Sequence, residues 1–89
     1  MAELTAVFRD RYGLHPRSAL RIQQEAGRFS ATVTIATEGG STVETRSMIS
    51  MVSAGIRTGE VVIIRAEGAD ADAAATAIAD LMASGVCHP

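Results

Sequence analysis

The stretch EVVIIRAEGADADAAATAIADLMASG, residues 60–85, carries the two clearest structural signals in the chain. Residues 60–68 are rich in Val and Ile and end in Gly, which predicts a strand. Residues 69–85 are rich in Ala, carry acids in the first turn and end at Gly85, which predicts a long helix. A strand followed directly by a helix indicates a domain in which sheet and helices pack in layers.

Five further elements precede this stretch. They are a short strand, a helix that starts at Pro16, an alternating strand, its hairpin partner and a short helix capped by Ser47. We expect them at residues 4–8, 16–26, 29–37, 42–46 and 48–55 respectively. The order of elements is therefore βαββαβα.

This order predicts the fold class. Helices that alternate with antiparallel hairpins imply an α+β, open-faced β-sandwich, in which a four-stranded antiparallel sheet is covered on one face by three helices. With 89 residues the chain is long enough for one domain and too short for two, so we expect a single domain over residues 1–89. A domain of this size has no room for a deep active site, and we expect its chemistry on the surface.

Charge is distributed unevenly along the chain. The formal net charge of -2 argues against a nucleic-acid partner. Residues 1–28 nevertheless carry five Arg against three acids, whereas residues 29–89 carry three Arg against seven acids. Every basic residue is Arg and none is Lys. The N-terminal third is therefore the part of the chain that would attract an anion.

Cysteine content and hydropathy bear on the compartment. The single Cys excludes an internal disulfide and fits a reducing cytoplasm. No apolar run approaches the roughly 18–20 residues that span a bilayer, and the N-terminus lacks a secretory pattern. We therefore expect a soluble, cytoplasmic protein without a membrane partner.

The segment YGLHPRSAL, residues 12–20, places a His at the start of the helix that begins at Pro16. The first N–H groups of a helix point out of its end and bind phosphate. There, a neutral imidazole of His15 could attack phosphorus, Arg17 could hold the phosphoryl oxygens, and Gly13 could let the backbone bend. The alternative interpretation is a solvent-exposed His beside an N-terminal Pro.

The residues GLHPRSA, 13–19, resemble the G-L-H-x-R-P-A motif of HPr, the histidine phosphocarrier family of the bacterial sugar phosphotransferase system. Residues 46–82 are similar to the second half of the family, with a Ser before a short Met-rich helix, a strand, an A-E-G turn and a long final helix. The resemblance covers nearly the whole chain and implies the HPr-like form of the fold expected above.

The resemblance also implies a function. His15 would accept phosphate on Nδ1 from enzyme I, itself charged by phosphoenolpyruvate, and pass it to IIA domains of sugar permeases, with Arg17 stabilising the phosphate. Such a protein is a carrier and not a turnover enzyme, and we expect it to be a monomer without a cofactor. Ser47 matches a position that a kinase phosphorylates in some bacteria, so a Ser kinase and its phosphatase are further candidate partners.

The motif departs from the family pattern at two positions. Ser18 stands where the family usually has Pro, and Pro16 stands where the family has a small or variable residue. Because Pro has no N–H, this exchange removes one candidate phosphate donor and adds the amide and hydroxyl of Ser18.

A carrier that docks on several partners needs an apolar surface beside its acceptor residue. We expect this surface to include four residues, of which the two Met could equally belong to the core: Leu20, Met48, Ile49 and Met51. No metal site is expected, because Cys87 and His88 are adjacent ligands without a second pair and are better interpreted as a frayed tail.

Three other functions remain open from the residues alone. A carrier of the nitrogen or regulatory branch would share the chemistry and differ in its partners. An acyl-phosphate hydrolase would need a water-orienting Asn, and the chain contains no Asn. In a small-ligand-binding regulatory module His15 would be incidental.

Overall fold

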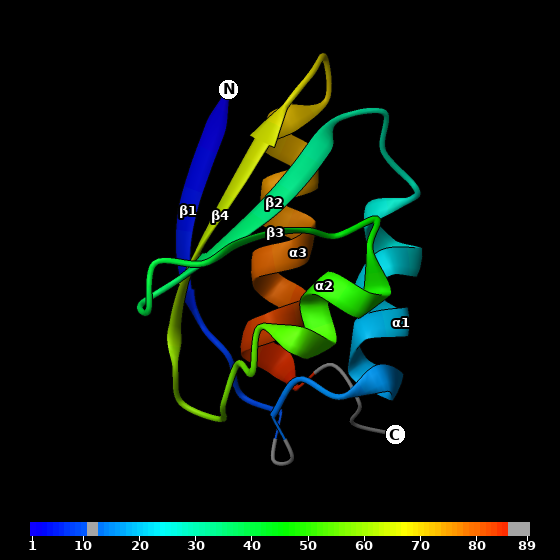
Figure 1. Ribbon diagram of the computed structural model, residues 1–89. Coiled ribbons are helices and arrows are strands. Elements are labelled where there is room, and N and C mark those ends of the chain that lie inside the picture. The colour runs from blue at the N-terminus through cyan, green and yellow to red at the C-terminus, as the bar shows by residue number, and fades with distance from the viewer. Residues whose placement is uncertain (11–12, 86–89) are drawn as a thin grey trace.

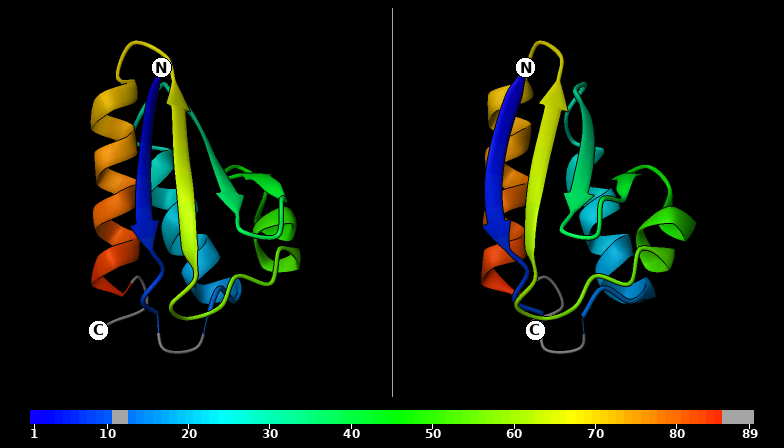
Figure 2. Two further views of the ribbon diagram at one scale, coloured as in Figure 1. Left: turned by 90° about the vertical axis from the view of Figure 1, so that its left-hand side faces the viewer. Right: turned by 60° about the vertical axis from the view of Figure 1, so that its left-hand side comes forward.

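The computed structural model describes residues 1–10 and 13–85. Its elements follow the predicted βαββαβα order. They are β1 (Ala2–Val7), α1 (Pro16–Ala26), β2 (Thr32–Thr37), β3 (Thr42–Glu44), α2 (Met48–Ser53), β4 (Val61–Glu67) and α3 (Ala71–Ser84). The strands form one sheet in the order β1-β4-β2-β3, and every neighbouring pair is antiparallel. All three helices lie on one side of this sheet (Figures 1 and 2), which confirms the predicted fold class.

The core lies between the sheet and the helices. In the central strand β4, Val62, Ile64 and Ala66 are fully buried, and the residues between them are more exposed. Ile64 pairs with Ile35 of β2, so the buried rows of neighbouring strands are continuous. Alternation of this kind is what a strand with one covered face requires. Helices α1 and α3 supply the opposing side of the core, chiefly through Ala and Ile side chains.

Strands β1 and β2 begin at other residues than predicted, for identifiable reasons. Strand β1 begins at Ala2, because residues 2 and 3 pair with the end of β4. Strand β2 begins at Thr32 and not at Phe29. The amides of Ser30 and Ala31 donate instead to the Asp70 carboxylate, at 2.9 and 2.8 Å, so these residues bind the start of α3 and do not join the ladder.

Two connecting segments lie against each other near the start of α1. The segment after β1 and the segment between α2 and β4 are joined by backbone hydrogen bonds, from Gly59 N to Phe8 O at 2.7 Å and from Leu14 N to Ile56 O at 2.9 Å. Residues on both sides of the connection between β1 and α1 are therefore bound to the segment between α2 and β4.

None of the helices within residues 1–10 and 13–85 has both the length and the apolar character needed to cross a membrane.

Candidate functional site

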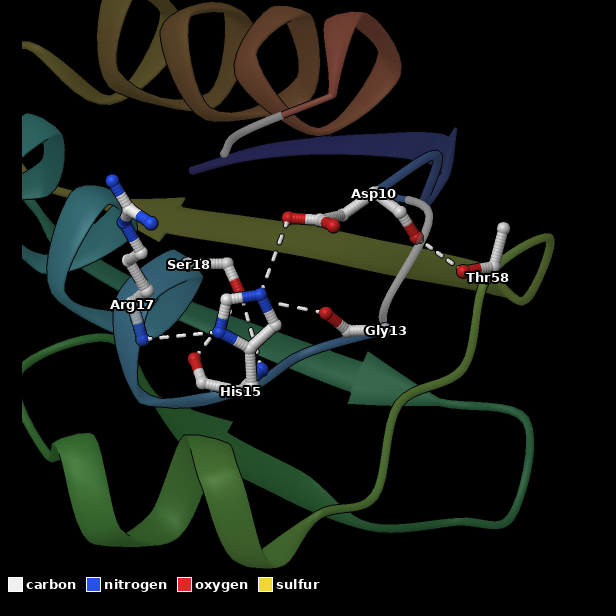
Figure 3. Close-up of polar contacts among 6 residues, drawn as sticks. All are labelled: Asp10, Gly13, His15, Arg17, Ser18 and Thr58. Carbon is white, nitrogen blue, oxygen red and sulfur yellow. Dashed lines mark hydrogen bonds and ion pairs between the residues drawn. The ribbon is translucent and has the colours of Figure 1, made fainter. Parts of the chain in front are cut away.

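His15 is the N-cap residue of α1, as its position before Pro16 predicts. Its backbone is extended (φ -122°, ψ 174°), and its Nδ1 accepts a hydrogen bond of 3.2 Å from the N–H of Arg17 (Figure 3). Because Pro16 occupies the first helical position and has no N–H, the Arg17 amide is the first that the helix offers. Nδ1 therefore presents a lone pair to the positive end of the helix, in the position where Ser, Thr, Asp or Asn usually caps.

Ser18 supplies the second half of the cap at the start of α1. Its hydroxyl accepts from the backbone N–H of His15 at 3.0 Å and donates toward the carbonyls of His15 and Gly13, at 3.1 and 3.4 Å. The residue is fully buried, and the two side chains form a capping box. The single hydroxyl proton of Ser18 is thus directed to backbone carbonyls. This leaves its amide as the stronger candidate for a phosphate donor.

Gly13 is required by the path of the backbone. Its φ is +75°, and a Cβ at this position would lie 2.9 Å from the carbonyl oxygen of Ile56. Both the left-handed conformation and the close approach favour Gly. The predicted role of Gly13 in backbone geometry therefore has two physical causes, and the second could not be read from the sequence.

Asp10 is a site residue that the sequence did not indicate. Its Oδ2 lies 3.9 Å from Nε2 of His15, on the side of the ring opposite Nδ1 (Figure 3). Its side chain is 3% exposed, whereas that of His15 is 29% exposed. An acid five residues before the His was the only available signal. Helical and strand spacings relate residues within one element, and Asp10 and His15 belong to no common element.

Arg17 contributes its backbone to the cap, while its side chain is exposed. In Figure 3 the guanidinium points away from the imidazole ring. Arg21 and Arg28 are held by ion pairs with Glu25. Within the described ranges 1–10 and 13–85, no such ion pair holds Arg17. Among the residues that the structure describes, no hydrogen bond or ion pair of its guanidinium has to break when the group swings toward an anion.

The candidate docking residues divide into three classes. Ile49 and Leu20 are 81% and 43% exposed, and Met48 is partly buried against the core. Met51 is 0% exposed, so the prediction that it lies on the docking surface is wrong. Two residues apart on a helix means nearly opposite faces, so Ile49 points to solvent when Met51 fills the core. Helices α1 and α2 pack side by side (Figure 1).

Ser47 is the N-cap of α2, as predicted. Its Oγ accepts from the Ser50 amide at 3.2 Å and lies 2.9 Å from the Ser50 hydroxyl. Capping alone accounts for a Ser at this position.

Within the part of the chain that the structure describes, no group of three or more His, Cys, Asp or Glu side chains could hold a metal ion. Cys87 and His88, interpreted above as a tail, lie outside the described residues.

Comparison with known proteins bears on what this site does. Residues 2–84 match the family described as "PTS HPr component phosphorylation site". The curated "Phosphocarrier protein HPr" of Mycoplasma capricolum subsp. capricolum is 37% identical over 83 residues, which are 92% of this chain and 91% of the relative.

Two solved structures show the same similarity in three dimensions. The crystal structure of HPr-C-His from Thermoanaerobacter tengcongensis has a TM-score of 0.86 and 33% identity, covering 94% of this chain and 93% of that chain. The phosphocarrier protein HPr from Bacillus anthracis str. Ames has a TM-score of 0.85 and 33% identity, covering 91% and 95%.

Proposed function

The chain belongs to the HPr family of phosphotransferase-system phosphocarriers, and we propose that Nδ1 of His15 is the atom that carries its phosphoryl group. The observation that supports this assignment is the hydrogen bond from the Arg17 amide to Nδ1. An acceptor nitrogen must hold a lone pair and not a proton. In neutral imidazole a nitrogen that accepts a hydrogen bond is the one without the proton.

The helix end provides for the charge of the phosphoryl group. When Nδ1 bonds to phosphorus, its lone pair is used, and the Arg17 amide turns from the nitrogen to a phosphoryl oxygen. The first-turn amides and the helix dipole then stabilise the group, as at other phosphate sites on helix N-termini. The exposed guanidinium of Arg17 adds a charge-assisted contact from the solvent side.

The exposed location of the site fits a carrier that meets its partners in turn. His15 lies at a surface, and the apolar side chains of Leu20 and Ile49 stand on the two helices that pack beside each other. We propose that enzyme I and IIA domains of sugar permeases dock on this surface, with Met48 at its edge. Because the phosphate donor and the phosphate acceptor would use the same surface, the protein would bind them one at a time. It would act in the cytoplasm as a monomer, and it would catalyse no turnover by itself.

Membership of a phosphocarrier family supports the carrier over an acyl-phosphate hydrolase and over a module in which His15 is incidental. The proposal of the sugar branch follows the resemblance of the motif. Transfer assays that offer a sugar-permease IIA domain and a nitrogen-regulatory IIA domain side by side would separate the two branches.

Two variants of His15 test the acceptor. Both His15→Ala and His15→Asn remove the imidazole, but Asn can still cap α1, so it separates lost chemistry from lost helix stability. After incubation with phosphoenolpyruvate and enzyme I, intact mass should show one acid-labile phosphate on the wild type and none on either variant. Acid-labile phosphate on His15→Asn would place the acceptor elsewhere.

A further inference from the structure

The two nitrogens of the His15 ring face opposite charges of the protein. Nδ1 meets an N–H at the positive end of α1, and Nε2 meets the Asp10 carboxylate at 3.9 Å (Figure 3). The distance from Nε2 to the carboxylate is within ion-pair range and longer than a direct hydrogen bond. The Asp10 side chain is almost completely buried, so the charge is screened much less than a surface charge would be.

Asp10 is held in place by contacts of its own backbone. Its carbonyl oxygen accepts from the amide of Gly13 at 3.1 Å and from the hydroxyl of Thr58, which stands on the connection between α2 and β4. The same connection receives the Leu14 amide. A local turn through Gly13 and a segment distant in sequence therefore fix the backbone of Asp10 near His15.

We propose that Asp10 is a positioning residue for phosphoryl transfer, which acts through Nε2 of His15. Its carboxylate favours the neutral tautomer that has the proton on Nε2, and so keeps the lone pair on Nδ1. It also faces the positive charge that the ring acquires when it takes up phosphate. This inference rests on the proposed role of His15 and adds a residue that the GLHPRSA motif does not contain.

Phosphoryl transfer to Nδ1 of His15 requires no proton transfer. The Nδ1 lone pair forms the N–P bond while the bond between phosphorus and the donor's leaving atom breaks, and that atom keeps the bonding pair. The proton stays on Nε2, so the ring carries one positive charge, which lies beside the carboxylate of Asp10. In the onward transfer the N–P pair returns to Nδ1, and the ring becomes neutral again. The carboxylate thus stabilises the charged ring in both directions.

The dedicated variant is Asp10→Asn, which keeps the shape and removes the charge. Its matched control is Asp72→Asn, an exposed acid in the first turn of α3, at the end of the sheet opposite the start of α1 (Figure 1). Imidazole 15N shifts of the unphosphorylated proteins report the tautomer, measured at about pH 8.5, where an ordinary imidazole is neutral. Initial rates with enzyme I as donor report the transfer step.

In the wild type and in Asp72→Asn the ring should be almost entirely in the form protonated on Nε2. In Asp10→Asn we expect the ratio of the two tautomers to fall about tenfold, and kcat to fall by a similar factor with KM unchanged. Thr58→Val, which removes a hydroxyl that holds the Asp10 backbone, should shift both quantities in the same direction by less. This second variant keeps the test available if Asp10→Asn folds poorly.

An unchanged tautomer ratio in folded Asp10→Asn would overturn the inference, whether or not the rate falls, since a merely structural role could also slow transfer. The tautomer measurement does not require phosphorylation. A wild type that carries no phosphate on His15 would therefore overturn the proposed function and leave the effect of Asp10 on the ring as a separate result.

Discussion

The backbone N–H of Arg17 donates a 3.2 Å hydrogen bond to Nδ1 of His15, so the nitrogen proposed to carry phosphate is also the cap of helix α1. When the ring gains or loses phosphate, the Arg17 amide would change its hydrogen-bond acceptor between Nδ1 and a phosphoryl oxygen. Because the helix end stays satisfied in both states, we expect little change of fold between them. A carrier that must be recognised by its donor when empty and by its acceptor when loaded benefits from such a constant shape.

Arg17→Ala removes the guanidinium and keeps the backbone amide. A charge-assisted contact to phosphate is worth roughly 1.5–3 kcal/mol, and exposure reduces it, so transfer in both directions should slow by about tenfold. Rates with enzyme I and with a IIA domain measure the effect. Arg21→Ala is the control, because Arg21 stands one turn further along and pairs with Glu25. Equal rates in the two variants would mean that the Arg17 side chain takes no part.

Ser18→Ala and Ser18→Pro separate the hydroxyl from the amide. Both lose the buried hydroxyl of the capping box, and we expect each to be destabilised by about 1–2 kcal/mol in urea unfolding. Only the Pro variant also loses the amide. If the amide holds the phosphoryl group, phosphohistidine should hydrolyse faster in Ser18→Pro than in Ser18→Ala. The same lifetime in both would leave the Arg17 amide and guanidinium as sufficient.

Ser47→Asp imitates a charge at the candidate regulatory position. Asp can still cap α2, so the free energy of unfolding should change by well under about 1 kcal/mol. The charge would lie beside Ile49, which we propose as a docking residue, so KM for enzyme I should rise. Ile49→Ser is the comparison, since it removes the apolar group without adding charge. A loss that saturating enzyme I does not restore would contradict a docking effect.

Asp70→Asn tests the contact that keeps Ser30 and Ala31 out of β2. The Ser30 amide, first, and then the Ala31 amide and the Ser30 hydroxyl lower the pKa of the Asp70 carboxyl below its ordinary value of 3.8. A lowered pKa stabilises the fold above that ordinary value, and the contribution is lost as the pH falls through the folded-state value. The difference in unfolding free energy between wild type and variant should therefore be larger at pH 7 than at pH 3. An equal difference at both pH values would contradict the account.

Regular spacing made most of the fold predictable. The alternation in residues 61–67 and the Ala-rich pattern of α3 each bury one face, and the structure has both elements close to the predicted limits. The place of His15 also followed from the sequence, because Pro16 marks the first helical position. In each case the structure is set by neighbours along the chain.

The misses come from contacts between distant residues. Asp10 reaches His15 because Gly13 and Thr58 hold the connection after β1, and no local pattern encodes that path. Met51 was expected at the docking surface because Met adapts to several partners, with a core position equally open. Its helix α2 has six residues, too few for a hydrophobic period to distinguish one face from the other.

The assignment of the phosphoryl group to Nδ1 of His15 can be tested on the phosphorylated protein itself. The protein is labelled with 15N in its His side chains, charged with phosphoenolpyruvate and the enzyme I of the same organism, and examined for the one-bond coupling between 15N and 31P. We expect this coupling at Nδ1 of His15 in the wild type and its loss in His15→Asn. Coupling at Nε2, or phosphate on any other residue, would contradict it.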